Sequence, residues 1–72
     1  IEIFPNPAVD VMNVSINGSA TYSITGLQGK LLQTGVVSNQ LVSVATLAKG
    51  IYLIQLFDES QELIHQQKLI KE

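Results

Sequence analysis

Turn-forming residues recur at short intervals along this chain, and their spacing constrains the fold more than any other feature. They interrupt the apolar runs about every 8–12 residues, which is typical of the short strands of a β-sandwich. Residues 12–17 and 20–25 alternate apolar and polar side chains, as half-buried strands do. The sequence therefore predicts an all-β fold, a small Ig-like β-sandwich of about seven short, mostly antiparallel strands. The expected strands are 1–4, 12–16, 20–25, 31–37, 41–45, 51–57 and 63–71.

Three local signals set the expected ends and types of these elements. Pro5 and Pro7 lack backbone donors and fix φ, so the first strand must stop before them. Asn17-Gly18 predicts a hairpin joining the strands on either side, because both residues accept a positive φ. Residues 61–71 fit a strand and also one side of a short helix, and the run of strands before them favours the strand.

The expected strand 51–57 is unusual because it is apolar on both faces. One face carries Tyr52, Ile54 and Leu56, and the other carries Ile51, Leu53 and Phe57 together with Gln55. An apolar stripe in water is an aggregation liability. We expect one face to fill the core and the other to be covered, either by the chain itself, for example by residues 5–7, or by a partner. Cover by the chain itself is the favoured interpretation.

The length and composition indicate one small domain, residues 1–72, and the first residue, Ile and not Met, favours a fragment cut from a longer protein. The chain has 72 residues, 46% of them hydrophobic, and begins with Ile. A chain of this size buries only about 60% of its unfolded surface. It has no cysteine, so neither a disulfide nor a thiolate metal site stabilises it.

The charge pattern excludes two classes of partner. The net charge is −2, with four lysines and no arginine, whereas nucleic-acid binding requires clustered cations and usually stacking aromatics. The longest apolar run has four residues, Ile51–Ile54, too few to span a membrane. No basic segment followed by an apolar core opens the chain, so no signal peptide is expected.

No catalytic or metal constellation stands out. His65, the only histidine, lies beside two glutamines with no nucleophile signature nearby, so we expect an exposed polar strand position. Asp58, Glu59 and Glu62 are expected to form a solvated turn and not a calcium site, because the EF-hand pattern is missing. Residues 26–30 (GLQGK) lack the P-loop spacing. We predict no enzyme activity and no cofactor.

Two further motifs have plain structural interpretations. Asn13-Val14-Ser15 and Asn17-Gly18-Ser19 match the glycosylation tripeptide, which arises often by chance. Tyr22 and Tyr52 share their strand faces with aliphatic residues, so we expect them in the core and not on a carbohydrate-binding platform.

Four stretches in order resemble the C-terminal sorting domain of the type IX secretion system, in its type A form, nearly from end to end. They are IFPNPAVDVMNVSI with Pro5, Asn6 and Pro7, YSITGLQGKLLQTG with Gly29 and Lys30, LAKGIYLIQL with Gly50 and Tyr52, and QKLIKE with Lys68 and Lys71. The chain departs from the family pattern at two positions. Ala48 stands where the family often has proline, and Lys30 stands where it often has arginine.

The resemblance implies a non-catalytic sorting signal attached to an N-terminal cargo in a Bacteroidetes-type bacterium. The cargo would enter the periplasm with its own signal peptide, and the outer-membrane translocon would read the folded domain. A surface sortase would usually remove the domain, leaving the cargo secreted or at the cell surface. No cofactor, nucleic acid or membrane insertion is implied.

Within this interpretation, Pro5–Pro7 would fix the entry of the chain and the two glycines would supply turns. Lys68 and Lys71 would offer charge to a partner, although for Lys68 protection of an edge strand is an equal explanation. We hypothesise that Lys71, Glu72 and the free carboxylate contribute to recognition. The alternatives are an adhesion or spacer β-sandwich that stays on the cargo, and a carbohydrate-binding module appended to a secreted enzyme.

Overall fold

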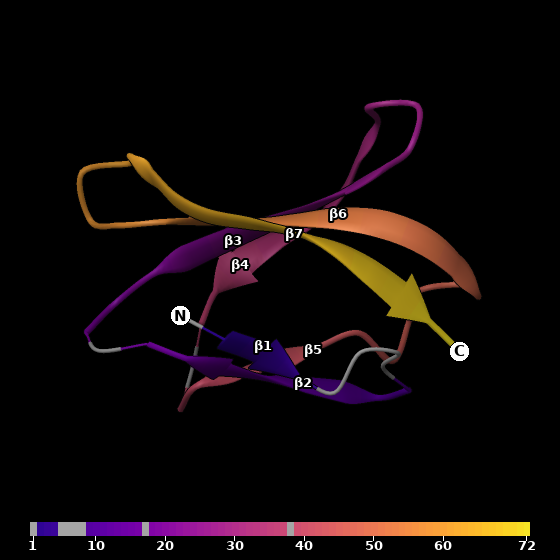
Figure 1. Cartoon of the computed structure of the whole chain (residues 1–72), viewed down its shortest axis with the longest axis horizontal. Helices are drawn as coiled ribbons and strands as arrows, with labels where there is room; N and C mark the ends of the chain where they lie inside the picture. Colours follow the sequence, from indigo (N-terminus) through magenta and orange to yellow (C-terminus); the bar gives the residue numbers. More distant parts are fainter. Residues whose placement is uncertain (1, 5–8, 17, 38) are drawn as a thin grey trace.

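The chain forms two antiparallel sheets that face one another (Figure 1). A computed structural model describes residues 2–4, 9–16, 18–37 and 39–72. One sheet has three strands in the order β1-β2-β5, and the other has four in the order β4-β3-β6-β7. The strands are β1 (Glu2–Phe4), β2 (Val11–Ser15), β3 (Thr21–Gly26), β4 (Leu31–Val36), β5 (Leu41–Ser43), β6 (Gly50–Phe57) and β7 (Leu63–Lys71). The predicted small β-sandwich is confirmed, and so is the strand over 63–71.

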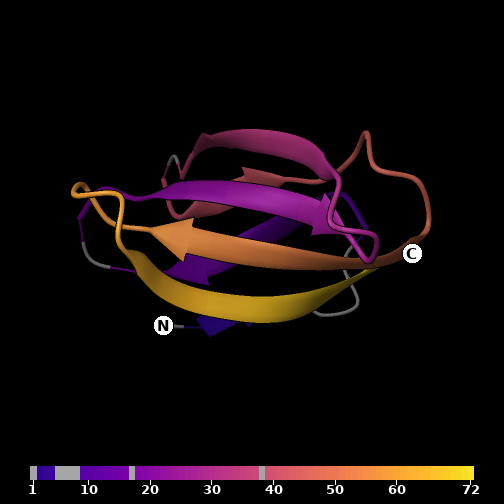
Figure 2. The ribbon, with the colours of Figure 1, turned by 90° about the horizontal axis from the view of Figure 1, so that it is seen from above.

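The core lies between the two sheets, because each strand turns alternate side chains toward the opposite sheet. Seen from above, the four-stranded sheet lies over the three-stranded one (Figure 2). Tyr22, Ile24, Ile54, Leu56 and Leu69 come from the four-stranded sheet, and the other core residues come from the three-stranded sheet and the residue after it. These are Ile3, Met12, Val14, Val42 and Val44. The strand 51–57 therefore does place one of its faces in the core, as predicted.

The predicted hairpin at Asn17-Gly18 is wrong, and Asn17 itself lies outside the described residues. Strand β2 pairs with β1 and β5, whereas β3 pairs with β4 and β6. The chain crosses from one sheet to the other between them. The alternation of apolar residues fixes which face of a strand is buried, but not which strand lies beside it. Placing β2 opposite β3 lets the apolar faces of the two sheets bury each other.

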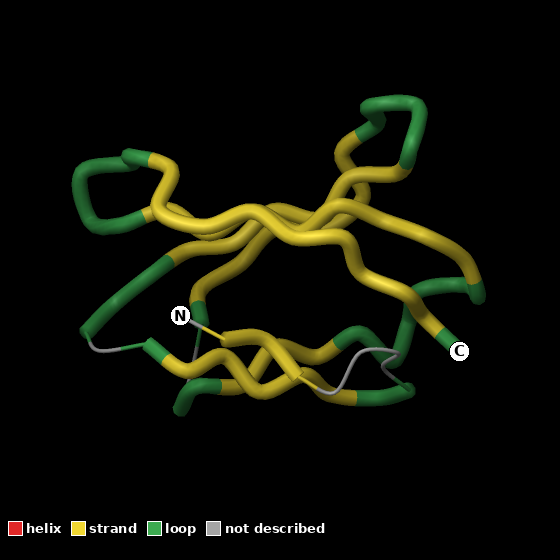
Figure 3. The backbone as a smooth tube through the Cα atoms, viewed as in Figure 1, coloured by secondary structure: helices red, strands yellow, loops and turns green. Residues whose placement is uncertain are grey.

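Two hairpins within the four-stranded sheet share one loop geometry, visible as the two green turns at its ends in Figure 3. In the β3–β4 hairpin, the Gly29 amide donates to the Gly26 carbonyl and the Gly26 amide donates to the Lys30 carbonyl. In the β6–β7 hairpin, the Gln61 amide donates to the Asp58 carbonyl and the Asp58 amide donates to the Glu62 carbonyl. Both loops place their fourth residue at positive φ, +85° at Gly29 and 65° at Gln61.

This equivalence predicts that Gln61→Gly stabilises the domain. A non-glycine residue at positive φ costs roughly 1–2 kcal/mol of stability. Glycine removes this strain, but it also raises the conformational entropy of the unfolded chain, which cancels part of the gain. We expect the free energy of unfolding to rise by about 0.5–1 kcal/mol. Urea unfolding followed by circular dichroism measures it.

Gly29→Ala is the matched control, since it places a side chain at the equivalent position of the other hairpin. It should destabilise the domain by about 1 kcal/mol. Nothing lies within 4 Å of a Cβ built on Gly29, so a loss of stability would report backbone strain and not a clash. Equal free energies of unfolding for the wild-type domain, Gln61→Gly and Gly29→Ala would contradict the equivalence of the two loops.

Candidate recognition surface

The second apolar face of β6 lies on the outward face of the four-stranded sheet. Its middle row of paired residues is polar: Ser23 Oγ donates to Gln55 Oε1 at 3.4 Å, and Gln55 Nε2 donates to Gln66 Oε1 at 2.9 Å. Leu53 and Phe57 lie on either side of this row at intermediate exposure. Leu53 is paired with Thr25 and Lys68, so neighbours in the sheet flank the stripe. Residues 5–7, the favoured cover, lie outside the described residues.

Six of the nine residues carried over from the family pattern lie at one end of the four-stranded sheet. Three contacts between strands bring them together: Thr25 pairs with Leu31, Leu53 with Lys68, and Gly50 with Lys71. We call this the basic end, and it holds Gly29, Lys30, Gly50, Tyr52, Lys68 and Lys71. In Figure 1 it is the right-hand side, where the β3–β4 turn, the start of β6 and the C-terminus lie. Pro5, Asn6 and Pro7 lie outside the described residues.

Gly50 and Tyr52 form a local unit at the start of β6. Gly50 has a φ of +157°, and a Cβ built on it would lie 3.8 Å from the Tyr52 ring. The Tyr52 hydroxyl donates to the Ala48 carbonyl at 2.5 Å, closing the entry to the strand. Ala48 is one of the two positions at which this chain departs from the family pattern. The Gly-x-Tyr spacing therefore fixes how the chain enters its central strand.

The two lysines of β7 differ in exposure. Lys68 is exposed and lies in an edge strand, where a lysine also protects against edge-to-edge pairing. Lys71 is only 9% exposed, and its Nζ donates to the backbone oxygen of Glu72 at 3.1 Å. Its long stem can lie inside the domain while the ammonium reaches the edge of the core. Lys71 therefore organises the end of β7 more than it displays charge.

The remaining predictions about chemistry have mixed outcomes. His65 was expected to be exposed, which is wrong. It pairs with the buried Leu56, is half-buried, and a ring nitrogen lies 3.1 Å from Gln67 Oε1. Tyr22 is buried as predicted, and Tyr52 has intermediate burial. The described residues hold no cluster of metal-ligating side chains and no helix of membrane-spanning length and apolarity.

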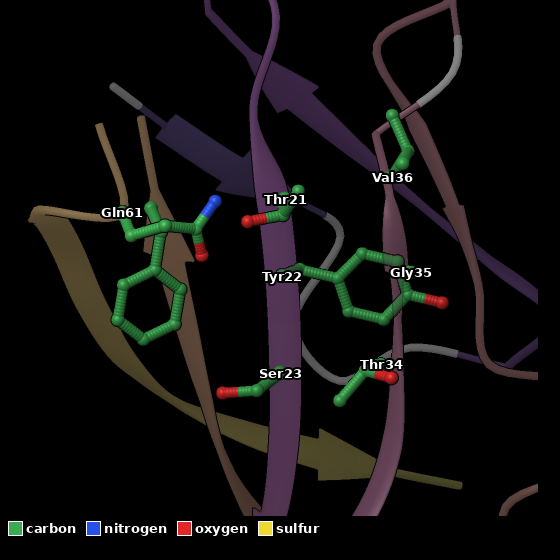
Figure 4. Close-up of a pocket in the computed structure, with 8 residues that line it drawn as sticks. Thr21, Tyr22, Ser23, Thr34, Gly35, Val36 and Gln61 are labelled. Atoms are coloured by element: carbon green, nitrogen blue, oxygen red, sulfur yellow. The ribbon is translucent and has the colours of Figure 1, made fainter. Parts of the chain in front are cut away.

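A hollow lies at the opposite end of the same sheet (Figure 4). It is a shallow groove of about 360 Å³, lined on one side by Thr21 and Ser23 and on the other by Thr34 and Val36. Gly35 leaves room for the Tyr22 ring, which lies 3.0 Å from where a Gly35 Cβ would be. Sequence reasoning missed this groove, because it depends on the pairing of β3 with β4.

The comparisons with known proteins decide the family. Residues 2–72 match the family described as "Secretion system C-terminal sorting domain". This chain belongs to that family, the C-terminal sorting domains of the type IX secretion system. The family consists of sorting signals and not of catalysts, and its members interact with the secretion machinery that exports them.

One relative is a protein named Beta-agarase D from Zobellia galactanivorans. It is 29% identical over all 72 residues of this sorting domain. The match spans only 15% of the length of the agarase. No solved structure matches the chain.

We predict that Tyr52→Phe weakens the sorting domain without unfolding it. The substitution keeps the ring beside Gly50 but removes the hydroxyl that donates to Ala48. A hydrogen bond of this kind contributes about 0.5–1.5 kcal/mol, which urea unfolding can resolve. Tyr22→Phe is the comparison variant, because its hydroxyl accepts from Gln33 Nε2 at 2.8 Å at the other end of the sheet. Full stability of Tyr52→Phe would show that the hydroxyl does not hold the entry to β6.

Proposed function

We propose that residues 1–72 form one domain that serves as the C-terminal address of a longer exported protein, in the type A form of the family. The cargo lies on its N-terminal side and reaches the periplasm with a signal peptide of its own. The outer-membrane translocon reads the folded domain, and a surface sortase then removes it. The family match over residues 2–72 supports this, and so does the relative, in which the matching stretch is a small share of a longer protein.

The observation that carries the proposal is the gathering of the family-pattern residues at the basic end. Lys30 and Lys68 lie more than thirty positions apart in the sequence, yet the pairings of Leu31 with Thr25 and of Lys68 with Leu53 bring them to the same end of the sheet. Both are exposed. In this proposal the exposed lysines offer charge to the translocon, while Gly29, Gly50 and Tyr52 hold the turn and the strand entry that position them.

Lys71 and Glu72 have a different part in the proposal. Because the Lys71 ammonium donates to the backbone oxygen of Glu72, it fixes the position of the last residue beside the exposed lysines. A long tail appended after Glu72 should then reduce export. Unchanged export with the tail would remove Lys71 and Glu72 from the recognised surface.

The test is an export assay with charge-neutralised variants. The domain is fused by its N-terminus to a fluorescent protein with a periplasmic signal, in a strain with an intact type IX system and in one without its translocon. The wild-type fusion should leave only the intact strain, with the domain removed from the product. Lys30→Gln with Lys68→Gln should lower export roughly five- to thirty-fold, if each charge contributes about 0.5–1 kcal/mol.

The matched control is Glu59→Gln with Glu62→Gln. Glu62 ends the β6–β7 hairpin as Lys30 ends the β3–β4 hairpin, and both glutamates are exposed. This control should be exported normally. Equal export of both double variants would argue against recognition through the basic end, whereas retention of the wild-type fusion would argue against the sorting role itself.

A further inference from the structure

The fold separates the charges of this chain along the four-stranded sheet. All four lysines, Lys30, Lys49, Lys68 and Lys71, lie at the basic end, since Lys30 directly precedes β4 and Lys49 directly precedes β6. Only one of the six acidic residues, Glu72, lies there. Asp58, Glu59 and Glu62 occupy the β6–β7 turn at the opposite end, and Glu2 lies on the other sheet. Asp10 lies beside that sheet, where its carbonyl accepts from the Val44 amide, close to the segment that leads into β6 at the basic end. A chain of net charge −2 thus presents one positive end.

Apolar side chains also project into solvent at the basic end. Leu27, in the β3–β4 turn, is 76% exposed, more than any other large hydrophobic residue in the described part of the chain. Leu31, Leu32 and Ile51 are exposed around it. In Figure 1 this turn stands away from the body of the sandwich. Where exposed apolar side chains are contiguous, they mark a contact surface.

Projecting apolar side chains at the same end of a sheet as exposed lysines have the chemistry of a membrane-interface contact. Apolar residues enter the boundary between headgroups and acyl chains, and lysines near the surface are attracted to anionic lipids. We propose that the basic end docks peripherally on a bilayer that carries anionic headgroups, with Leu27 entering the headgroup layer. This inference goes beyond the proposed function and does not rest on it.

Two observations point to a lipid surface as a partner of this end besides the translocon. The cations are all lysines and none is arginine, and a lysine near a bilayer surface is attracted to anionic lipids. Leu27 lies in the projecting β3–β4 turn, where its side chain can enter the headgroup layer without a preformed groove on the protein.

Vesicle co-sedimentation of the 72-residue chain tests the proposal. The probes are vesicles of phosphatidylcholine alone and of phosphatidylcholine with phosphatidylglycerol. We expect binding only to the anionic vesicles at low salt, with loss at about 0.5 M salt, where screening reduces the attraction of surface charges. Leu27→Asn should lower partitioning by about fivefold or more, which is the loss of roughly one kilocalorie of transfer free energy.

A charge swap separates the position of the charges from their number. Lys49→Glu combined with Glu59→Lys keeps the net charge but moves one cation from the basic end to the opposite turn. It should lower partitioning by roughly twentyfold, since a lysine near the surface contributes about a factor of five and an acidic residue opposes binding similarly. Neither residue belongs to the family pattern, and both are exposed.

Val36→Asn is the matched control for Leu27→Asn. Val36 is 65% exposed but lies at the groove end of the sheet, so its substitution should leave vesicle binding unchanged. Equal binding to both kinds of vesicle, no binding at low salt, or an equal loss with Val36→Asn would overturn the proposal. Binding of a soluble polyglutamate peptide at the basic end, with no binding to vesicles, would also overturn it and assign this end to an acidic protein. Thermal unfolding of each variant checks that it is folded.

Discussion

The burial of Ile54 and Leu56 is the interaction on which the rest of this domain depends. Both lie on the inward face of β6, the strand that pairs with β3 on one side and β7 on the other. Removing one such aliphatic side chain from a core typically costs about 2–5 kcal/mol. A domain of this size without a disulfide or metal rarely has more than roughly 3–5 kcal/mol in total. The loss of either side chain would therefore remove most or all of the free energy of unfolding of this domain.

The outward face of β6 is also apolar, except at Gln55. Gln55 interrupts the stripe at the point where Ser23 and Gln66 flank it, and the three side chains form a hydrogen-bonded row. The polar residue thus has partners on both neighbouring strands. A strand with a sheet neighbour on each side can carry apolar residues outward, because cross-strand side chains cover part of each one. Leu53 and Phe57 are half-buried in this way.

The sequence predicted where the strands lie, but not which strands lie beside one another. Apolar alternation located β2 and β3 within a residue or two, because a period of two is a local property. It failed at Asn17-Gly18, because a turn signal does not say whether the next strand lies beside the last one or across the core. The inward position of His65 was missed for a related reason: it follows from the pairing of His65 with the buried Leu56. The family pattern identified residues of the basic end, but their proximity is set by long-range pairings.

The lysines of the basic end come to one end of the sheet only through long-range strand pairing, which limits the kind of signal this domain can carry. Lys30, Lys49 and Lys68 are far apart in the sequence and lie at one end of the same sheet only when β3, β4, β6 and β7 are paired. An unfolded chain would present the same lysines singly, and each would be screened over about 10 Å at moderate ionic strength. If the basic end is what its partner reads, the address exists only in the folded state. A core substitution such as one at Ile54 would then reduce recognition through the folded fraction, although the Ile54 side chain is fully buried and meets no partner.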